Sequence, residues 1–208
     1  MNKHTPEITP DEKADLLDQA EQLAKTWAAI GQECDAENRF PTETVEPYKQ
    51  SAVIAMAVPK RYGGLGADIH TASQVARVLA KGDPSIALAY NMHQAMVGIF
   101  RNTPALDEDV RAWIMTAVAR ERKILCGPFS EARAGLSGLA DTVAVPDGDG
   151  WRITGKKNWS TLVLGSDLIA LNATVTDPDG SLPDDFREHA KREAVFIIPN
   201  DSPNLTVD

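Results

Sequence analysis

Hydrophobic residues recur at steps of three and four through the first half of the chain, the spacing of one face of an α-helix. The first such stripe comprises Leu16, Leu17, Ala20, Leu23, Ala24, Trp27 and Cys34. Before it, Thr9, Pro10 and Glu12 combine a capping hydroxyl, a proline at the first helical position and a glutamate three residues after the cap. The pattern therefore predicts a long amphipathic helix that starts directly after Thr9.

Further helices are predicted by the same periodicity. A short helical piece around Tyr48 leads into an apolar run at 53–58, and residues 69–82 form another amphipathic stripe that Gly82 ends. Residues 85–100 are apolar nearly all round, which predicts a central helix buried by its neighbours. In the last predicted helix of this half, the positions expected to face inward are Val110, Trp113, Ile114, Ala117 and Val118.

Near Ile124 the period changes to that of strands. Short apolar or alternating runs predict strands at 124–126, 142–145, 151–154, 168–176 and 194–198, with a hairpin turn at 146–150. The expected fold class is therefore α+β, with an all-helical domain over residues 1–123 followed by a β domain over residues 124–208.

Composition narrows the range of functions. With 43% hydrophobic and 25% charged residues, the 208-residue chain has the make-up of an ordinary globular protein. A net charge of −9 argues against a general affinity for nucleic acid, and no apolar run reaches the roughly 18 residues of a membrane span. We expect a cytoplasmic protein with reduced, buried Cys34 and Cys126, and we expect the basic pairs, Lys156-Lys157 among them, to be solvated.

The segment that follows the strand at 151–154 has unusual chemistry. Gly155 ends the alternation, and Trp159 then offers a flat surface beside the hydroxyls of Ser160 and Thr161. This combination suits the edge of a polar aromatic ring such as a flavin. From these residues alone, a hairpin with a core tryptophan and a hydroxyl-rich turn is the simpler explanation of the pattern.

Other sites have little support in the sequence. The four histidines lie near no cysteine or carboxylate at metal-ligand spacing, so no metal site is expected. No serine-hydrolase elbow occurs, because Ser137 is displaced by one position from that motif. His93, inside the apolar helix, is expected to be a hydrogen-bonded core residue.

Several motifs resemble one family. Residues 155–161, Gly-Lys-Lys-Asn-Trp-Ser-Thr, resemble the G-x-K-x-W-I-T segment of the acyl-CoA dehydrogenases. Residues 128–131, Pro-Phe-Ser-Glu, together with 134–137, Ala-Gly-Leu-Ser, resemble the L-T-E-P-x-A-G-S-D segment of that family. Looser matches lie at 40–41, 58–66 and 82–93 in the family's order, so the resemblance covers the N-terminal and part of the middle domain.

The resemblance implies an FAD-dependent oxidoreductase with a helical domain and part of a β-barrel domain. The implied reaction is the α,β-desaturation of an acyl thioester, in which a base removes a proton and a hydride passes to flavin N5. The family's C-terminal helical bundle, which supplies that base, is absent from this chain. We therefore expect no catalytic residue here, and expect the missing part to come from further chain or from a partner chain.

The resemblance also implies cofactor contacts and partners. Phe129 and Ser130 would lie at the pyrimidine end of the flavin, Trp159 against the ring and Thr161 near N5, with Ser137 and Ser160 completing the cofactor-binding set. The expected partners are a small-molecule substrate, an acyl-CoA being the family's choice, and an electron-transfer protein or oxygen. A homo- or hetero-oligomer is expected.

Departures from the family pattern leave alternatives open. Ala132 replaces the family's proline, Gly138 its aspartate and Ser160 its isoleucine, and Leu136 is an insertion. These changes put the CoA thioester in question. One alternative is a flavin monooxygenase of the same fold, in which His93 would face the site of oxygen reaction, and another is a non-catalytic assembly subunit.

Overall fold

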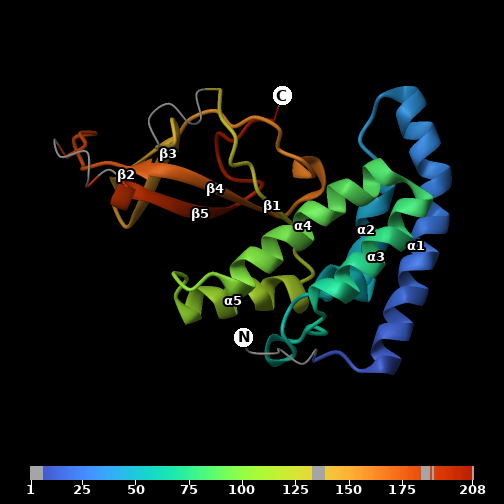
Figure 1. The fold of residues 1–208 in the computed structure, drawn as a ribbon. Helices are drawn as coiled ribbons and strands as arrows, with labels where there is room; N and C mark the ends of the chain where they lie inside the picture. The colour runs from blue at the N-terminus through green and yellow to red at the C-terminus, as the bar shows by residue number, and fades with distance from the viewer. Residues whose placement is uncertain (1–6, 133–138, 184–187, 189, 208) are drawn as a thin grey trace.

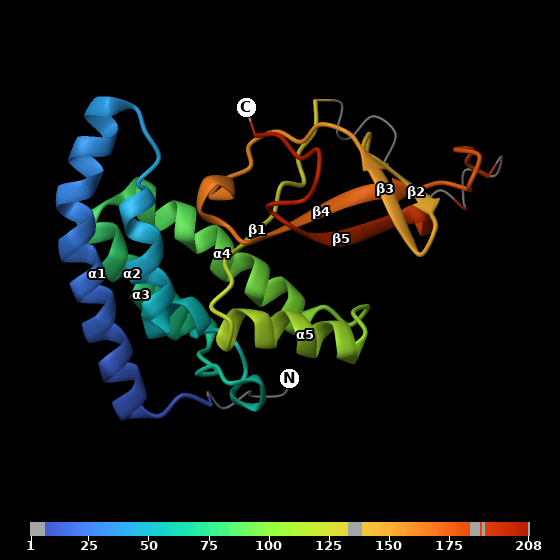
Figure 2. The same cartoon turned by 180° about the vertical axis from the view of Figure 1, so that it is seen from behind.

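A computed structural model describes residues 7–132, 139–183, 188 and 190–207. The helices gather in one lobe and the strands in another, and the views from both sides agree on this division (Figures 1 and 2). Helix α4, Pro84–Asn102, contacts strand β1, Leu125–Cys126, where the two lobes meet. The helical region followed by a mixed sheet confirms the predicted α+β class.

The helical lobe begins with the predicted long helix, α1, Pro10–Glu37. Its capping box is present: the amide of Glu12 donates to Thr9 Oγ1 at 3.3 Å, and the amide of Thr9 donates to Glu12 Oε2 at 2.7 Å. The other α-helices in the described part are α2, Val45–Gln50; α3, Ile69–Gly82; α4; and α5, Glu108–Ala119. Single 3-10 turns occupy Thr42–Thr44, Ala52–Ala55 and Lys60–Tyr62.

Aromatic rings form the centre of the helical core. Tyr90 of α4 stacks between Trp27 of α1 and Tyr48 of α2, with ring centroids 5.1 and 4.1 Å apart. The same core continues into Ile124 and Leu125, across the predicted domain boundary. The two lobes are therefore packed against each other rather than tethered.

The strands form one mixed sheet. Within the described residues these are β1; β2, Val143–Asp147; β3, Gly150–Thr154; β4, Leu168–Val175; and β5, Glu193–Pro199. Strand β4 is central: it pairs in parallel with β1 and β2 and antiparallel with β5, while β2 and β3 form an antiparallel hairpin. Leu168 and Ala170 join the helical core, and Ile169, Leu171 and Ala173 join a second core, which explains the unbroken apolar run of β4.

Helix α5 is rotated relative to the prediction. Val110 and Trp113, predicted to face inward, are 41% and 49% exposed, so that prediction was wrong for both. The buried face instead carries Arg111, whose guanidinium donates to Thr103 O at 2.8 Å and to Leu106 O at 3.0 Å. Binding the carbonyl groups that follow α4 fixes this rotation, and an apolar periodicity does not encode it.

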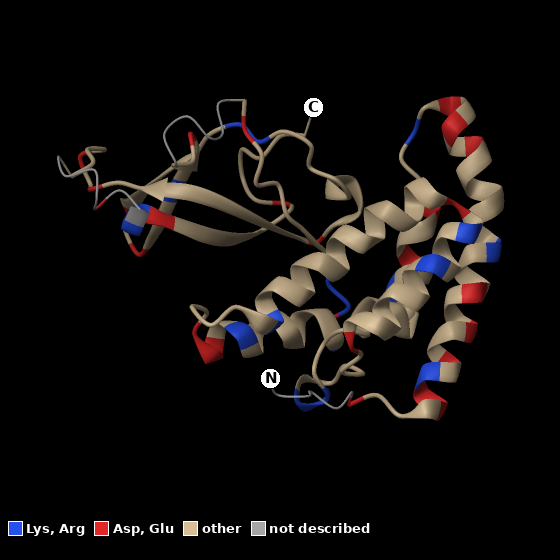
Figure 3. Ribbon diagram, in the orientation of Figure 1, with Lys and Arg blue, Asp and Glu red and all other residues tan. Residues whose placement is uncertain are grey.

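Helix α4 is also less enclosed than predicted. Leu88 and Ile99 are 62% and 51% exposed, although His93, Met96 and Val97 are buried. Figure 3 shows that α4 carries little charge, while charged residues crowd α1. Among the described residues, no helix is long and apolar enough to cross a membrane, and no cluster of three or more His, Cys, Asp or Glu could hold a metal ion.

Candidate functional site

Two segments that are distant in sequence lie side by side beyond the β2–β3 hairpin. The amide of Asn158 donates to Ser130 O at 2.8 Å, and the two residues form an isolated antiparallel bridge. The β2–β3 hairpin lies between them in sequence and brings Asn158 back beside Ser130. The structure thereby joins the two segments that carry most of the predicted flavin contacts.

A buried ion pair adjoins this bridge. Lys157 Nζ lies 2.6 Å from Glu131 Oε1, and the two side chains are only 9% and 2% exposed. Lys157 also donates to Asn172 Oδ1, on β4, at 2.8 Å. The prediction of a solvated Lys156-Lys157 pair was therefore wrong for Lys157, because the partners that make its burial possible come from distant parts of the chain.

Glu131 accepts several hydrogen bonds besides the one from Lys157. The amide and hydroxyl of Thr142 donate to Oε1 at 2.9 and 2.6 Å, and the amide of Asp141 donates to Oε2. Burial raises the pKa of Glu131, but the hydrogen bonds from Lys157, Thr142 and the two amides outweigh burial and lower the pKa to about 2. Glu131 is therefore an ionised carboxylate throughout the neutral range.

Gly155 allows the two ends of the β2–β3 hairpin to approach each other. A Cβ at this position would lie 2.3 Å from Thr142 Oγ1 and 2.7 Å from Thr142 Cα, so backbone and side chain pass too closely for any larger residue. Strand β3 ends at Thr154, directly before this contact, as predicted. The absence of a side chain at Gly155 thus leaves the space that the Thr142 hydroxyl needs to bind Glu131.

The turn after Asn158 presents Trp159 to solvent. Trp159 and Leu162 have φ angles of +53° and +71°, in the left-handed region that non-glycine residues rarely adopt. The Trp159 side chain is 83% exposed, whereas Leu162 is 4% exposed and anchors the turn in the core. The reading of Trp159 as a core tryptophan is therefore wrong. Residues in sparsely populated backbone regions cluster at active sites and ligand-binding segments.

Several polar groups of this turn have no hydrogen-bond partner in the described part of the chain. Within the described ranges, the hydroxyls of Ser130, Ser160 and Thr161 have no hydrogen-bond partner, and neither do the amides of Trp159 and Ser160. The amide of Thr161 donates locally, to Trp159 O at 2.9 Å. The bridged segments 127–131 and 158–161, which we call the ledge, thus offer a set of free donors beside an exposed aromatic face. Ser137, predicted to join this set, lies outside the described residues.

The ledge rests on α4. A Cβ on Gly127 would lie 2.4 Å from Met96 Sδ and 3.0 Å from the ring of Phe129, so the backbone contacts the helix directly. Phe129 remains 37% exposed. The ledge is therefore bounded by the helical lobe on one side.

A cavity of about 680 Å³ opens on the far side of Leu162. It is lined by the end of α1 and the following loop, with Cys34 and Phe40, and by the first turns of α4, with Ile86 and Tyr90. Its volume is within the range of small-molecule sites. Because Leu162 directly follows Thr161, the cavity and the ledge share one turn.

His93 is a structural residue. The amide of Leu125 donates to its Nδ1 at 3.0 Å, so the ring proton lies on Nε2, which donates to Ile54 O at 2.9 Å. The side chain is fully buried, and burial lowers its pKa to about 4 despite these contacts. The predicted hydrogen-bonded core histidine is confirmed. The alternative in which His93 faces the site of oxygen reaction stays a hypothesis, and in this structure both ring nitrogens bind backbone groups.

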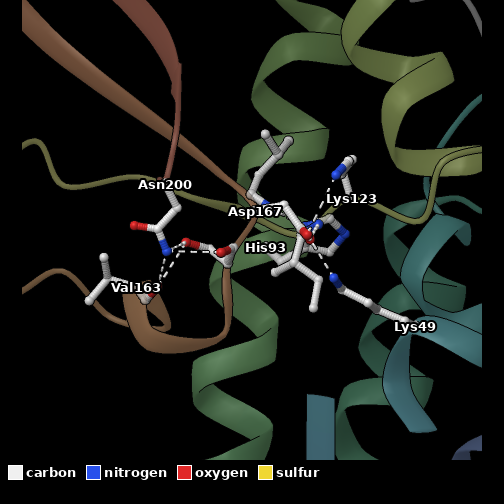
Figure 4. A network of polar contacts seen from close by, with 9 residues as sticks. Lys49, His93, Lys123, Val163, Asp167 and Asn200 are labelled. Atoms are coloured by element: carbon white, nitrogen blue, oxygen red, sulfur yellow. Dashed lines mark hydrogen bonds and ion pairs between the residues drawn. The ribbon is translucent and has the colours of Figure 1, made fainter. Parts of the chain in front are cut away.

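Asp167 binds groups of the helical lobe and of the sheet where the two lobes meet, as Figure 4 shows. Its Oδ1 accepts from Lys49 Nζ at 2.7 Å, and its Oδ2 accepts from the amide of Ile124 at 2.8 Å. The backbone amide of Asn200 donates to Asp167 O at 2.9 Å, and its side-chain Nδ2 donates to Val163 O at 2.7 Å. This network joins α2, β1, β4 and the 3-10 turn Val163–Gly165 that follows the ledge.

The sequence alone does not indicate that Glu131 pairs with Lys157. Glu131 belongs to a family motif and Lys157 to a basic pair, and neither pattern specifies a partner. One usable signal is their place in the sequence, because Glu131 directly follows Ser130 and Lys157 lies two residues before Trp159.

The chain is similar to known proteins. The family model described as the acyl-CoA dehydrogenase N-terminal domain matches residues 10–116. A probable acyl-CoA dehydrogenase of Mycobacterium tuberculosis, FadE25, is 30% identical over 202 residues, which cover 95% of this chain and 49% of that protein. Isobutylamine N-hydroxylase of Streptomyces viridifaciens is also 30% identical, over 73% of this chain and 39% of its own length.

The solved structures include flavin enzymes. FMN-bound TdsC from Paenibacillus sp. A11-2, a dibenzothiophene monooxygenase, matches with a TM-score of 0.71 at 25% identity, over 89% of this chain and 44% of that one. The chain spans about half the length of the relatives it matches. The family model matches just over half of the residues of this chain, which shows that the chain belongs to the acyl-CoA dehydrogenase family.

Proposed function

We propose that the ledge is one wall of a flavin site in an oxidoreductase of the acyl-CoA dehydrogenase type. The observation that carries the proposal is the bridge between Ser130 and Asn158, which brings the two candidate segments together although the β2–β3 hairpin separates them in sequence. Relatives that are dehydrogenases and relatives that are flavin monooxygenases both support a flavin.

The exposed groups suit the polar edge of an isoalloxazine ring. That edge carries carbonyl oxygens and ring nitrogens, which free hydroxyl and amide donors can bind, and the flat face of the ring can cover an indole. Ser130, Ser160 and Thr161 retain free hydroxyls among the described residues, and Trp159 is 83% exposed. The donor set therefore fits the cofactor.

Each proposed contact has a separate task. Phe129 and Ser130 bind the pyrimidine end, Trp159 covers the ring and Thr161 donates near N5, while Ser137 and Ser160 complete the set. When bound, the flavin supplies a two-electron acceptor. Donors that point at an edge which gains negative charge on reduction stabilise the reduced form, so these residues favour electron uptake.

We propose FAD as the cofactor and the α,β-desaturation of an acyl thioester as the reaction. The relationship to a probable acyl-CoA dehydrogenase across 95% of the chain supports this choice. The test uses the complete protein with any further chain that belongs to it. Heat-released cofactor is identified by mass, and acyl-CoA substrates of several lengths are added without oxygen. Bleaching of the flavin absorbance by an acyl-CoA is expected, and FAD that no acyl-CoA reduces would overturn the desaturation.

A flavin monooxygenase is the second candidate, and Ser160 favours it. The family's isoleucine is replaced there by a hydroxyl that is free among the described residues, and isobutylamine N-hydroxylase matches this chain at 30% identity. Incorporation of labelled oxygen into an added amine or sulfur compound by the reduced protein would select this reaction. A complete protein that is colourless and takes up neither FAD nor FMN would instead indicate a non-catalytic assembly subunit.

A further inference from the structure

Glu131 and Lys157 are close in sequence to the proposed flavin contacts. Of the described contacts, all but Thr161 lie within three positions of one of these two residues. Glu131 directly follows Ser130, and Lys157 precedes Asn158 and Trp159. The Nζ–Oε1 distance is 2.6 Å, and both side chains are at least nine-tenths buried. Whatever fixes these two side chains therefore also fixes the backbone of the ledge.

Glu131 gathers donors from different parts of the chain. Lys157 and both donor groups of Thr142 bind Oε1, and the amide of Asp141 binds Oε2. Thr142 directly precedes β2 and Lys157 follows β3, so one carboxylate ties both ends of the hairpin to the segment that carries Ser130. Four donors to two oxygen atoms leave the carboxylate a narrow range of positions.

Lys157 extends the same connection into the sheet. Its second acceptor, Asn172 Oδ1, lies on the central strand β4, and Asn172 Nδ2 donates in turn to Glu193 Oε1 of β5 at 2.7 Å. The lysine is therefore held by the central strand of the sheet. A side chain held in this way transmits its position to the following turn at Trp159.

We propose that Glu131 and Lys157 are positioning residues for the flavin, which hold the two segments of the ledge at the spacing the ring requires. This inference rests on the proposed flavin site and adds that the buried charges serve cofactor binding more than folding. Ion pairs of this kind can be replaced by apolar residues with little loss of stability, because the pair no longer has to be desolvated. The replacement would keep the fold and lose the directional hydrogen bonds that set the spacing of Ser130 and Asn158.

The pair also makes a specific electrostatic prediction. As a pair, the two charges nearly cancel at the proposed ring, whereas each single neutral substitution leaves the other charge behind. Glu131→Gln leaves the ammonium, which favours the negative charge of the reduced flavin, so the reduction potential rises. Lys157→Met leaves the carboxylate, so the potential falls. A role in folding alone would not give shifts of opposite sign.

The experiment compares wild type, Glu131→Gln, Lys157→Met and the Glu131→Leu/Lys157→Met double variant. The control is Lys49→Met, which breaks another ion pair, with Asp167 at 2.7 Å and side chains 22% and 18% exposed, in the junction rather than the ledge. FAD affinity, melting temperature and flavin reduction potential are measured on the complete protein. We expect the double variant to melt within a few degrees of wild type and to bind FAD at least tenfold more weakly, and Lys49→Met to melt lower with FAD affinity unchanged.

The outcomes separate the two proposals. A wild-type protein that binds no flavin would overturn the proposed function, and this inference with it. A wild type that binds FAD, with a folded double variant that binds it equally well, would overturn the positioning role alone. If the double variant does not fold, the two single variants decide: potentials that shift in opposite directions support the inference, and potentials that shift together or not at all contradict it.

Discussion

The amide of Leu125, the first residue of β1, donates to Nδ1 of His93 in the middle of α4 at 3.0 Å. Nε2 of the same ring binds Ile54 O, so one neutral imidazole joins α4, the turn after α2 and the first strand. The two lobes therefore meet through a group that cannot accept a proton without losing the bond from Leu125. This contact gives the stability of the protein a specific dependence on pH.

Acidification should weaken the protein through His93. Its pKa is about 4 in the folded state, against an ordinary 6.5, so the unfolded chain takes up a proton that the folded protein does not between these values. The contribution of neutral His93 to the free energy of unfolding is complete above about pH 6.5. It decreases by about 1.4 kcal/mol for each unit by which the pH falls, or by about 3 kcal/mol at pH 4.

Urea unfolding of wild type and His93→Gln at pH 7 and pH 5 checks this dependence. Wild type should lose about 2 kcal/mol more than the variant between the two pH values. Glu131 does not interfere, because its contribution is lost only as pH falls below its ordinary 4.5 toward about 2. Equal losses in both proteins would mean that His93 is not held neutral.

Two tryptophans near the hairpin should behave differently. Trp159 is 83% exposed and should contribute to flavin binding, whereas Trp151 is 48% exposed and packs edge to face on Phe196 at 5.6 Å. Trp159→Ala should change the free energy of unfolding by less than about 0.5 kcal/mol and weaken FAD binding. Trp151→Ala should cost about 1 kcal/mol and leave FAD binding intact.

Chemical denaturation and FAD titration of the two variants measure both quantities. The small cost for Trp151 reflects its partial exposure, and a loss of several kcal/mol would contradict this reasoning. Equal effects of the two substitutions on FAD binding would remove the special role of Trp159.

Alanine should have opposite effects at two glycines. At Gly155 the new methyl group would meet Thr142 at 2.3 Å, displace the hydroxyl that binds Glu131 and cost about 1 to 3 kcal/mol. At Gly98 in α4 a Cβ meets no heavy atom within 4 Å, and Gly98→Ala should stabilise the helix by about 0.5 to 1 kcal/mol. Thermal unfolding compares the two, and a Gly155→Ala protein as stable as wild type would contradict the close contact.

Much of the fold follows from local pattern. Helix α3 has the predicted bounds, Ile69–Gly82, because Asp68 caps its first turn and its apolar stripe packs on α1. Strand β4 was predicted from its apolar run, which the structure explains by burial on both faces. Periodicity indicates which face of an element is apolar. It is sufficient for α3 and β4 because each keeps the same pattern of burial from end to end.

Features that depend on distant partners could not be predicted. The burial of Lys157 depends on Glu131 and Asn172, and the rotation of α5 depends on Arg111 reaching the carbonyl groups beyond α4. Family resemblance did place Ser130 and Trp159 in one candidate site, and the structure brings their segments together. It could not indicate the ion pair that fixes the distance between them.

The hydroxyl groups of the ledge provide the most direct test of the flavin site. Ser130→Ala and Thr161→Val remove hydroxyls that have no partner among the described residues, so the melting temperature of the flavin-free protein should change little. If each hydroxyl binds the ring, each loss costs about 1.4 kcal/mol, or tenfold in affinity. Titration of the complete protein with FAD should therefore show about a hundredfold weaker binding in the double variant. Binding as tight as that of wild type, or no FAD binding by wild type, would contradict the account.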